Sequence, residues 1–337
     1  MAGEFDLIKT FFSRTSGEQK QSQQGSGVYL GVADDCAIFK QTPGTHIATS
    51  MDLLIEGRHF FADVDPYSLG HKSLAVNLSD LAAMGAKPLG CLLGLALPKV
   101  DPSWLEAFSQ GFYALAEQYA CPLIGGDTTR SEQGITVSVT VFGEVRPPFL
   151  QRNKAQMGDD IWLSGSLGAA HTALRLLLKK SAGGQLSTLE QDLLQGTRQA
   201  LELPTPRLCL GQALPQVAHA MLDISDGLIQ DLSHILNQSR CAADIYEPLL
   251  PVHTALAGMD PLLVREAVLG GGDVYELCFT APLQQRERLQ KLSLDLNIPL
   301  TRIGVIRPAE AGLPLVRVVD QFAQPVDYFY AGFDHFS

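Results

Sequence analysis

The sequence predicts a protein of two domains, over residues 1–147 and 148–337, with alternating strands and helices of α/β type in the second. Three observations support this. A chain of 337 residues is long enough for two hydrophobic cores. The first half mixes helical and alternating apolar patterns, whereas strand and helix patterns alternate along the second half. Between them, residues 146–158 carry paired prolines and several basic residues, which is typical of a domain boundary.

The composition restricts the partners that we expect. With 46% hydrophobic and 18% charged residues, the chain resembles an ordinary globular protein. Its net charge of -11 argues against affinity for nucleic acid or an anionic membrane, although an acidic protein binds phosphates when a divalent cation stands between them. No signal peptide is evident, and the longest apolar stretch, 91–97, is too short to span a bilayer. The six scattered cysteines, without a CxxC pair, indicate reduced thiols in a cytoplasmic protein.

The first strands of the N-terminal domain carry acidic residues. Asp34 and Asp35 lie between two apolar runs, where adjacent acids are most often solvated turn formers and less often ligands. Asp52 lies inside the apolar run 47–55, which predicts a strand. Because acids are depleted in strands, Asp52 is a stronger candidate for a ligand.

The next element is a helix that begins at Asp65-Pro66 and ends near Gly85. Its residues Ser73, Asn77 and Asp80 are spaced so that they share one face of an otherwise apolar helix. Because burial of an unpaired carboxylate is costly, this face is expected to meet a cation or a wet cleft. The alternative is an aspartate that forms local hydrogen bonds near the helix end.

Four more elements complete the N-terminal domain. Residues 90–97 predict a strand covered on both faces, and a helix begins at Asp101-Pro102. In 123–130 we expect a strand end that runs into a turn carrying Asp127. Residues 135–141 alternate between apolar and hydroxyl side chains and predict a half-buried strand.

In the C-terminal domain, residues 160–168 predict a strand and a small-residue turn, and a helix follows. At residues 220–232 a second strand ends at Asp223, and Ser225 and Asp226 follow in the turn before a helix. Asp226 is either the cap of that helix or, with Asp223, a ligand at the edge of the sheet. A triple glycine at 270–272 precedes a third strand.

The acidic residues of both halves suggest one chemistry. If the fold gathers them, divalent cations must neutralise their repulsion, and Mg²⁺ completes its coordination with phosphate oxygens. A nucleotide held in this way needs no P-loop, and the chain has no Gly-Lys dipeptide and no His-Arg-Asp kinase motif. The candidates are Asp35, Asp52, Asp80, Asp127, Asp223 and Asp226.

Four segments in series, 77–86, 125–129, 223–228 and 332–336, resemble the thiamine-monophosphate kinases. That family shares a superfamily with aminoimidazole ribonucleotide synthetase, selenophosphate synthetase and the hydrogenase-maturation dehydratase. The resemblance implies an N-terminal α+β domain, whose sheet forms a dimer-spanning barrel in a homodimer, followed by a C-terminal α/β domain. It places ATP and several Mg²⁺ ions in a cleft between the two domains. It further implies direct transfer of the ATP γ-phosphoryl group to thiamine monophosphate, in the biosynthesis of thiamine diphosphate.

The resemblance also assigns roles to residues. The thiamine end of the substrate would meet His59, Asp273 and Tyr330. The nucleotide would contact Gly126, Asp127, Arg152 and Ser225. No general base is implied, because a phosphate monoester with a second pKa of about 6 is already a dianion at neutral pH. The metal ligands would be Asp35, Ser50, Asp52, Asp80, Asp127, Asp223 and Asp226.

Some positions depart from the family pattern. Ala33 stands where the family usually has glycine, and Met51 where it has threonine. In the segment 271–276, Asp273 is one methylene shorter than the usual glutamate, and Val274 replaces an acid. Two alternatives therefore stand beside a thiamine-monophosphate kinase. One is another ATP-using synthetase or dehydratase of the superfamily, and the other is a non-catalytic protein that binds a nucleotide or thiamine.

Overall fold

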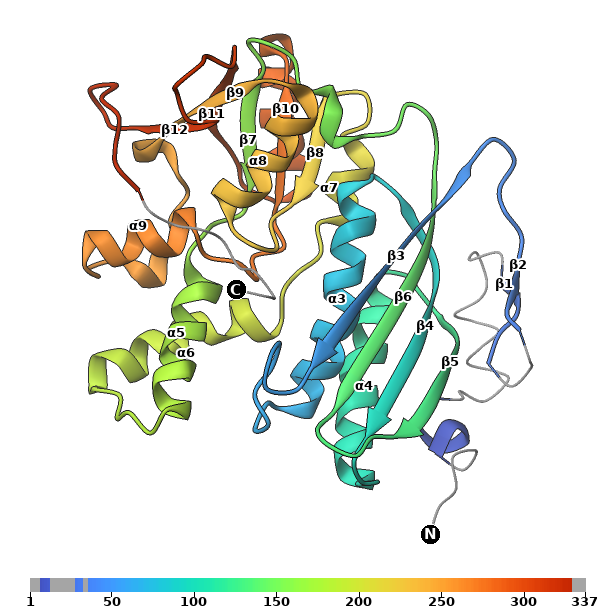
Figure 1. Cartoon of the computed structure of the whole chain (residues 1–337). Coiled ribbons are helices and arrows are strands. Elements are labelled where there is room, and N and C mark those ends of the chain that lie inside the picture. The colour runs from blue at the N-terminus through green and yellow to red at the C-terminus, as the bar shows by residue number, and fades with distance from the viewer. Residues whose placement is uncertain (1–6, 13–27, 33–35, 329–337) are drawn as a thin grey trace. The chain divides into compact units, whose positions relative to one another are not determined.

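The computed structural model describes residues 7–12, 28–32 and 36–328 (Figure 1). The described residues fall into two compact units. The N-terminal unit comprises those up to Leu81 together with Ala86–Pro147, and the C-terminal unit comprises Ala82–Gly85 and the described residues from Pro148 onward. In the part of the chain that is described, no helix is long and apolar enough to cross a bilayer.

The N-terminal unit is built around a four-stranded sheet in the order β3-β6-β4-β5. Strand β6 pairs antiparallel with β3 and β4, whereas β4 and β5 run parallel. A separate antiparallel pair is formed by β1 and β2. The elements are η1 (Ile8–Phe12), β1 (Val28–Leu30), β2 (Ile38–Phe39), β3 (His46–Ile55), α3 (Pro66–Ala83), β4 (Lys87–Leu97), α4 (Pro102–Gln118), β5 (Leu123–Arg130) and β6 (Thr136–Val145).

The predicted helices of this unit are confirmed, with their start signals. Asp65 precedes α3, and its carboxylate accepts the N–H of Ser68 at 2.9 Å. Asp101 caps α4 by accepting from the N–H groups of Ser103 and Trp104. Both helices lie on one face of the sheet, which we call the inner face (Figure 1). The predicted turn at 123–130 is wrong, because β5 continues as a strand through Asp127.

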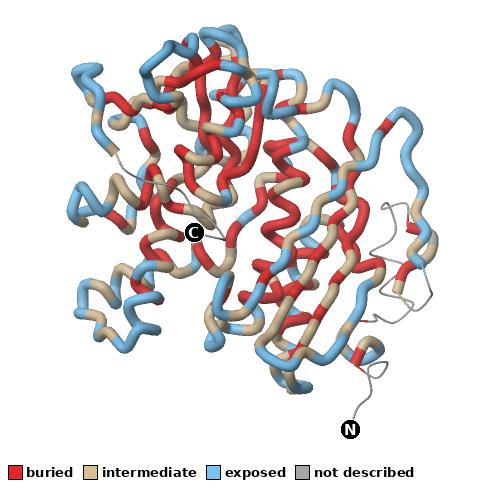
Figure 2. Tube along the Cα trace, in the orientation of Figure 1, coloured by how far each residue is buried: buried red, intermediate tan, exposed pale blue. Residues whose placement is uncertain are grey.

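The outer face of the sheet stays partly open in one chain. Along β3 the apolar residues Ile47, Met51, Leu53 and Ile55 are 39–55% exposed, whereas Leu54 on the inner face is 6% exposed. Most of this strand is exposed or intermediate in burial (Figure 2). Strands β4 and β6 alternate in the same way between buried and half-buried residues. The expectation that residues 90–97 are covered on both faces is therefore not met within one chain.

The C-terminal unit is built around a six-stranded sheet in the order β12-β9-β11-β7-β10-β8. The alternation of strands and helices predicted an α/β domain, but only β9 and β12 pair in parallel, and the other four pairs are antiparallel. The sheet is therefore mixed. The elements are η2 (Arg152–Lys154), β7 (Asp160–Ser164), α5 (Ala169–Ser181), α6 (Thr188–Glu202), α7 (Leu208–Ala213), β8 (Ala220–Asp223), α8 (Leu228–Ser239), β9 (Ala242–Tyr246), η3 (Glu247–Leu249), η4 (Thr254–Leu256), α9 (Pro261–Leu269), β10 (Leu277–Ala281), η5 (Leu283–Gln285), α10 (Arg286–Leu296), β11 (Leu300–Arg307) and β12 (Val316–Val319).

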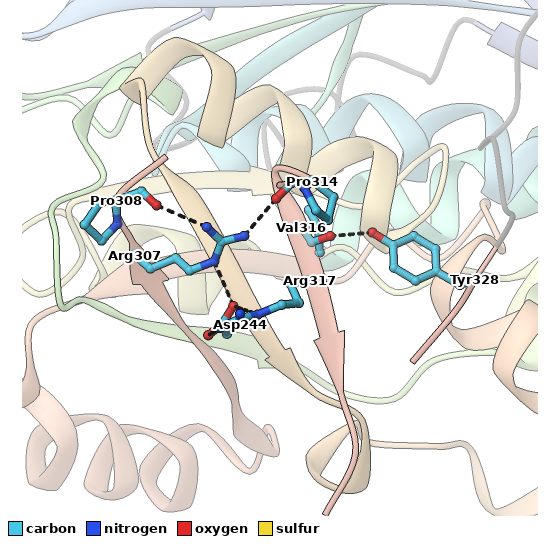
Figure 3. Close-up of polar contacts among 7 residues, drawn as sticks. All are labelled: Asp244, Arg307, Pro308, Pro314, Val316, Arg317 and Tyr328. Atoms are coloured by element: carbon cyan, nitrogen blue, oxygen red, sulfur yellow. Dashed lines mark hydrogen bonds and ion pairs between the residues drawn. The ribbon is translucent and has the colours of Figure 1, made fainter. Parts of the chain in front are cut away.

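Polar contacts hold the parallel edge strand in place (Figure 3). Asp244 on β9 accepts from Arg307 at 2.8 Å and from its register partner Arg317 at 2.9 and 2.6 Å. Arg307 also donates to the carbonyl of Pro314 at 2.8 Å, in the loop before β12. The hydroxyl of Tyr328 donates to the carbonyl of Val316 at 2.6 Å, which ties the last described residue to the same strand.

Helices α3 and α4 cross with their backbones in contact, and glycine permits this. A Cβ atom on Gly111 of α4 would lie 1.9 Å from the carbonyl oxygen of Tyr67 on α3. We expect Gly111→Ala to lower the free energy of unfolding by about 3 kcal/mol, at the upper end of overpacking effects. Urea denaturation measures this, with the exposed Gln110→Ala expected to stay within about 0.5 kcal/mol. A Gly111→Ala protein as stable as that control would contradict the close crossing.

Candidate functional site

In the N-terminal unit, β3 and α3 bring two of the predicted acids together. Asp52 on β3 and Asp80 on α3 are both half-buried. Burial, and then the negative charge of Asp80, raise the pKa of Asp52 to about 7. Ser50, two residues earlier on the same face of β3, donates its hydroxyl hydrogen bond to the Asp80 carboxylate. We call Ser50, Asp52 and Asp80 the N-terminal acid group.

The polar stripe on α3 explains how this group is held. Asn77 is fully buried, and its side-chain oxygen accepts the backbone N–H of Asp52 at 3.1 Å. Its amide nitrogen donates to the carbonyl of Ser73 at 3.1 Å. Asn77 therefore fixes β3 against α3 at the residue that carries the candidate ligand. Ser73 itself serves the helix, because its hydroxyl donates to the carbonyl of Gly70.

His59 lies in the turn that follows β3. Its Nδ1 accepts the backbone N–H of Ile55 at 3.0 Å, so a neutral ring carries its proton on Nε2. The side chain is half-buried.

Asp127 lies apart from the N-terminal acid group within one chain. It is exposed on β5, and β5 and β3 are the two opposite edge strands of the sheet. The register pairs Asp127 with Gly94, while Asp52 pairs with Val139, and Val139 pairs with Leu93. Because side chains alternate along a strand, Asp127 belongs to the outer face and Asp52 to the inner face. The structure therefore does not bring these two carboxylates together.

In the C-terminal unit, a turn between β8 and α8 carries three of the predicted residues. We call residues 223–227 the Ser225 turn. Asp223 ends β8 and is buried, Ser225 is exposed, and Asp226 is half-buried. Asp226 does not cap α8 as the sequence allowed, since Gly227 occupies the N-cap position and Asp226 accepts from Gln230 at 3.3 Å.

Sequence reasoning missed Asp231, which holds the Ser225 turn from the first turn of α8. One oxygen of its carboxylate accepts the backbone N–H groups of Ser225 at 3.0 Å, Asp226 at 2.9 Å and Gly227 at 3.1 Å. Asp231 is 4% exposed, and burial raises its pKa to about 6 although the three hydrogen bonds oppose this. The only sequence signal was an acid in the first turn of a helix, which is common for other reasons.

The segment that carries Asp273 lies against the Ser225 turn. The N–H of Asp273 donates to the carbonyl of Ser225 at 2.8 Å, and the N–H of Tyr275 donates to that of Ile224 at 2.7 Å. Asp273 and Tyr275 both have positive φ, at 59° and 54°. The Tyr275 hydroxyl donates to the Asp273 carboxylate at 3.2 Å. The structure thus places the predicted substrate residue Asp273 beside the predicted ligands Asp223 and Asp226.

A buried ion pair, also unforeseen from the sequence, anchors the end of this segment. Glu276 is 7% exposed and accepts two hydrogen bonds from Arg207, one of them 2.7 Å long, and one from the Ser164 hydroxyl. Arg207 immediately precedes α7, and Ser164 ends β7. The pair therefore joins the segment at 273–276 to two other elements of the unit.

Other predicted residues lie elsewhere or outside the described part. Arg152 in η2 is exposed, and its carbonyl accepts from Ser239 at the C-terminal end of α8, away from the Ser225 turn. Asp35 and Tyr330 lie outside the described residues, as do Asp34 and the motif at 332–336. Among the residues described, no three His, Cys, Asp or Glu side chains are grouped as a ready metal site.

Comparisons with known proteins identify the family of this chain. Residues 33–145 match the family model described as AIR synthase related protein, N-terminal domain. A thiamine-monophosphate kinase of Haemophilus influenzae is 39% identical over 99% of this chain and 98% of its own length. The chain belongs to the thiamine-monophosphate kinase family. The predicted resemblance is thereby confirmed.

Solved structures of the thiamine-monophosphate kinase family share the fold. The crystal structure of the kinase from Stenotrophomonas maltophilia is 42% identical, with a TM-score of 0.80 over 89% of this chain and 95% of that chain. A structure described as AaThiL complexed with AMPPCP and TMP is 28% identical, with a TM-score of 0.73 over 96% of this chain and 99% of that chain. The match extends over both units.

The structure clarifies one departure from the family pattern. Val274 is partly buried and packs against the apolar core of the C-terminal unit. Its neighbours Asp273 and Tyr275 instead make the polar contact described above. An apolar side chain at 274 is therefore accommodated by core packing. The hydrogen bond between Tyr275 and Asp273 does not depend on an acid at this position.

The Arg207 and Glu276 pair gives a test of how the segment is anchored. We expect Arg207→Met to lower the free energy of unfolding by about 3–5 kcal/mol, because it leaves the Glu276 charge buried without this partner. Lys179→Met is the matched control, since it breaks a 2.7 Å pair with Glu190 that is much more exposed and should cost about 1 kcal/mol or less. Equal losses in urea denaturation would contradict the anchoring role.

Proposed function

We propose that this chain transfers the γ-phosphoryl group of ATP to thiamine monophosphate. An oxygen of the acceptor phosphate attacks Pγ, the bond between Pγ and the β-γ bridging oxygen breaks, and thiamine diphosphate and ADP result. The sequence identity to thiamine-monophosphate kinases over 99% of the chain supports this, as does the similarity to the structure described as complexed with AMPPCP and TMP. The observation that carries the proposal within this molecule is the N-terminal acid group.

The acid group fits divalent cations. Asp52 and Asp80 are half-buried carboxylates close enough that each disfavours the charge of the other, and both present hard oxygen atoms. Asp223, Ser225 and Asp226 present a second set in the C-terminal unit. We propose Asp35, Ser50, Asp52, Asp80, Asp127, Asp223 and Asp226 as ligands of several Mg²⁺ ions. When bound, Mg²⁺ neutralises phosphate charge and polarises the transferring group.

The residues of the chain are proposed to position the reactants and not to move protons. Because the acceptor phosphate is already a dianion, no general base is required. Gly126, Asp127, Arg152 and Ser225 are proposed to contact the nucleotide, and the exposed Arg152 carries the positive charge of this set. Since three backbone N–H groups of the Ser225 turn already bind Asp231, a contact from Ser225 is expected through its exposed hydroxyl.

The thiamine end is proposed to meet His59, Asp273 and Tyr330. Thiamine is a cationic aromatic group, which suits a carboxylate and an aromatic ring. The hydrogen bond from Tyr275 holds the Asp273 carboxylate at a defined orientation. This compensates in part for a side chain one methylene shorter than the glutamate usual in the family.

We propose that the chain forms a homodimer in which the outer faces of two N-terminal sheets close into a barrel. The exposed apolar residues of β3 support this, because a row of such side chains on one sheet face favours burial. Closure also places each edge strand of one sheet against an edge strand of the other. A cytoplasmic location is proposed from the six free thiols.

Product analysis with ATP and thiamine monophosphate tests the proposed activity. We expect thiamine diphosphate and ADP in equal amounts. Asp80→Asn should slow turnover on the order of 100-fold or more while leaving the unfolding transition nearly unchanged, because a candidate metal ligand is lost. The exposed Asp63→Asn is the matched control and should retain normal turnover. Binding of Mg²⁺ and ATP without any product indicates a non-catalytic binder, and turnover of another acceptor alone indicates a different superfamily activity.

Dimerisation has its own test. We expect Met51→Glu, on the exposed face of β3, to weaken self-association by about tenfold or more, because it places a charge inside the proposed interface. Sedimentation equilibrium measures the dissociation constant, with Asp63→Asn again as the control. A wild-type protein that stays monomeric at micromolar concentration would rule out the barrel.

A further inference from the structure

The Ser225 turn has an unusual internal partner. Three consecutive backbone N–H groups converge on one carboxylate oxygen of Asp231, at 2.9–3.1 Å. Such a group of amides at the start of a helix is a ready binding site for an anion, often a phosphate. Here a side chain of the protein itself occupies it. The amides are therefore used to shape the turn, and they are not available to a nucleotide while Asp231 holds them.

The turn is clamped from two sides. Asp231 accepts hydrogen bonds from the backbone N–H groups of the turn. The carbonyls of Ile224 and Ser225 accept hydrogen bonds from backbone N–H groups of the segment that carries Asp273. Gln230, next to Asp231 in the same turn of α8, donates to the Asp226 carboxylate. With these contacts in place, the exposed Ser225 and the half-buried Asp226 have little freedom to move relative to α8. The first turn of the helix thus fixes the residues to which we assign metal and nucleotide contacts.

We propose that Asp231 is a positioning residue for the phosphoryl transfer. Its carboxylate keeps Ser225 and Asp226 in the arrangement that receives the nucleotide, without touching substrate itself. This inference rests on the proposed function, since it concerns the residues proposed there as ligands. It assigns a role to a buried acid that neither the motif spacing nor the resemblance to the family identified.

The chemistry of the side chain makes Asp231→Asn an informative substitution. Asparagine has nearly the same shape and keeps one oxygen acceptor, but it loses the negative charge that strengthens all three hydrogen bonds. It also introduces an NH₂ group that cannot accept from the amides. A weakened clamp leaves the hydrophobic core of the unit in place. We therefore expect a folded protein whose turn is less well ordered.

The test measures binding of a non-hydrolysable ATP analogue by calorimetry over a range of Mg²⁺ concentrations. We expect Asp231→Asn to raise the Mg²⁺ concentration for half-maximal binding by about tenfold, the scale of one lost charge-assisted hydrogen bond. The turnover number should fall by a similar factor, with a smaller change in KM for thiamine monophosphate. Asp192→Asn, which removes an exposed carboxylate near the start of α6, is the matched control and should show neither change.

The outcomes separate positioning from mere stability. A folded Asp231→Asn protein with unchanged Mg²⁺ dependence and turnover overturns the proposal. Should this variant not fold, Asp231→Glu carries the test, because it keeps the charge but displaces it, and the same shift in Mg²⁺ dependence is expected. If neither variant folds, Asp231 is a structural residue and the proposal is wrong. Wild-type protein that binds the analogue with Mg²⁺ but makes no thiamine diphosphate refutes the proposed activity and leaves the binding test of Asp231 intact.

Discussion

Electrostatic repulsion between carboxylates held close together is the constraint on which the rest of this molecule depends. Asp52 and Asp80 face each other across the contact between β3 and α3, and burial together with the second charge moves the pKa of Asp52 to about 7. A fold selected for stability alone gains nothing from this arrangement. The buried Asn77 accepts the backbone N–H of Asp52 and so holds β3 against α3 despite this repulsion. The proposed Mg²⁺ ions would neutralise this repulsion.

The C-terminal unit supports its acids by a different device. Asp223 and Asp226 sit on a turn whose shape is set by Asp231 from one side and by the segment at 273–276 from the other. The buried Arg207 and Glu276 pair anchors that segment in turn. Buried contacts thus hold the residues around Asp226 in one arrangement, as preorganisation of a phosphoryl-transfer site requires. The described candidate ligands of both units lie on strands, on helix α3 or in the short turn between β8 and α8.

Local sequence patterns predicted much of the N-terminal unit. The helix from Asp65-Pro66 and the position of Asp52 in a strand follow from capping and periodicity, and the structure has both. Partners distant in sequence were not predictable, such as Glu276 with Arg207 or Asp231 with its three amides. The directions of the strands in the C-terminal sheet were also not predicted. Alternating strand and helix patterns do not specify which strands become neighbours or whether these pair in parallel. Asp127 illustrates the limit, since only the sheet order shows that it lies on the far edge from Asp52.

The carboxylates of Asp52 and Asp80 are proposed to hold Mg²⁺ that neutralises the charge of the transferring phosphate. A crystal structure of the chain with Mg²⁺, a non-hydrolysable ATP analogue and thiamine monophosphate tests it most directly. We predict Mg²⁺ bound by the carboxylates of Asp52 and Asp80 in that crystal structure. A bound nucleotide with Asp52 and Asp80 both free of metal would contradict it.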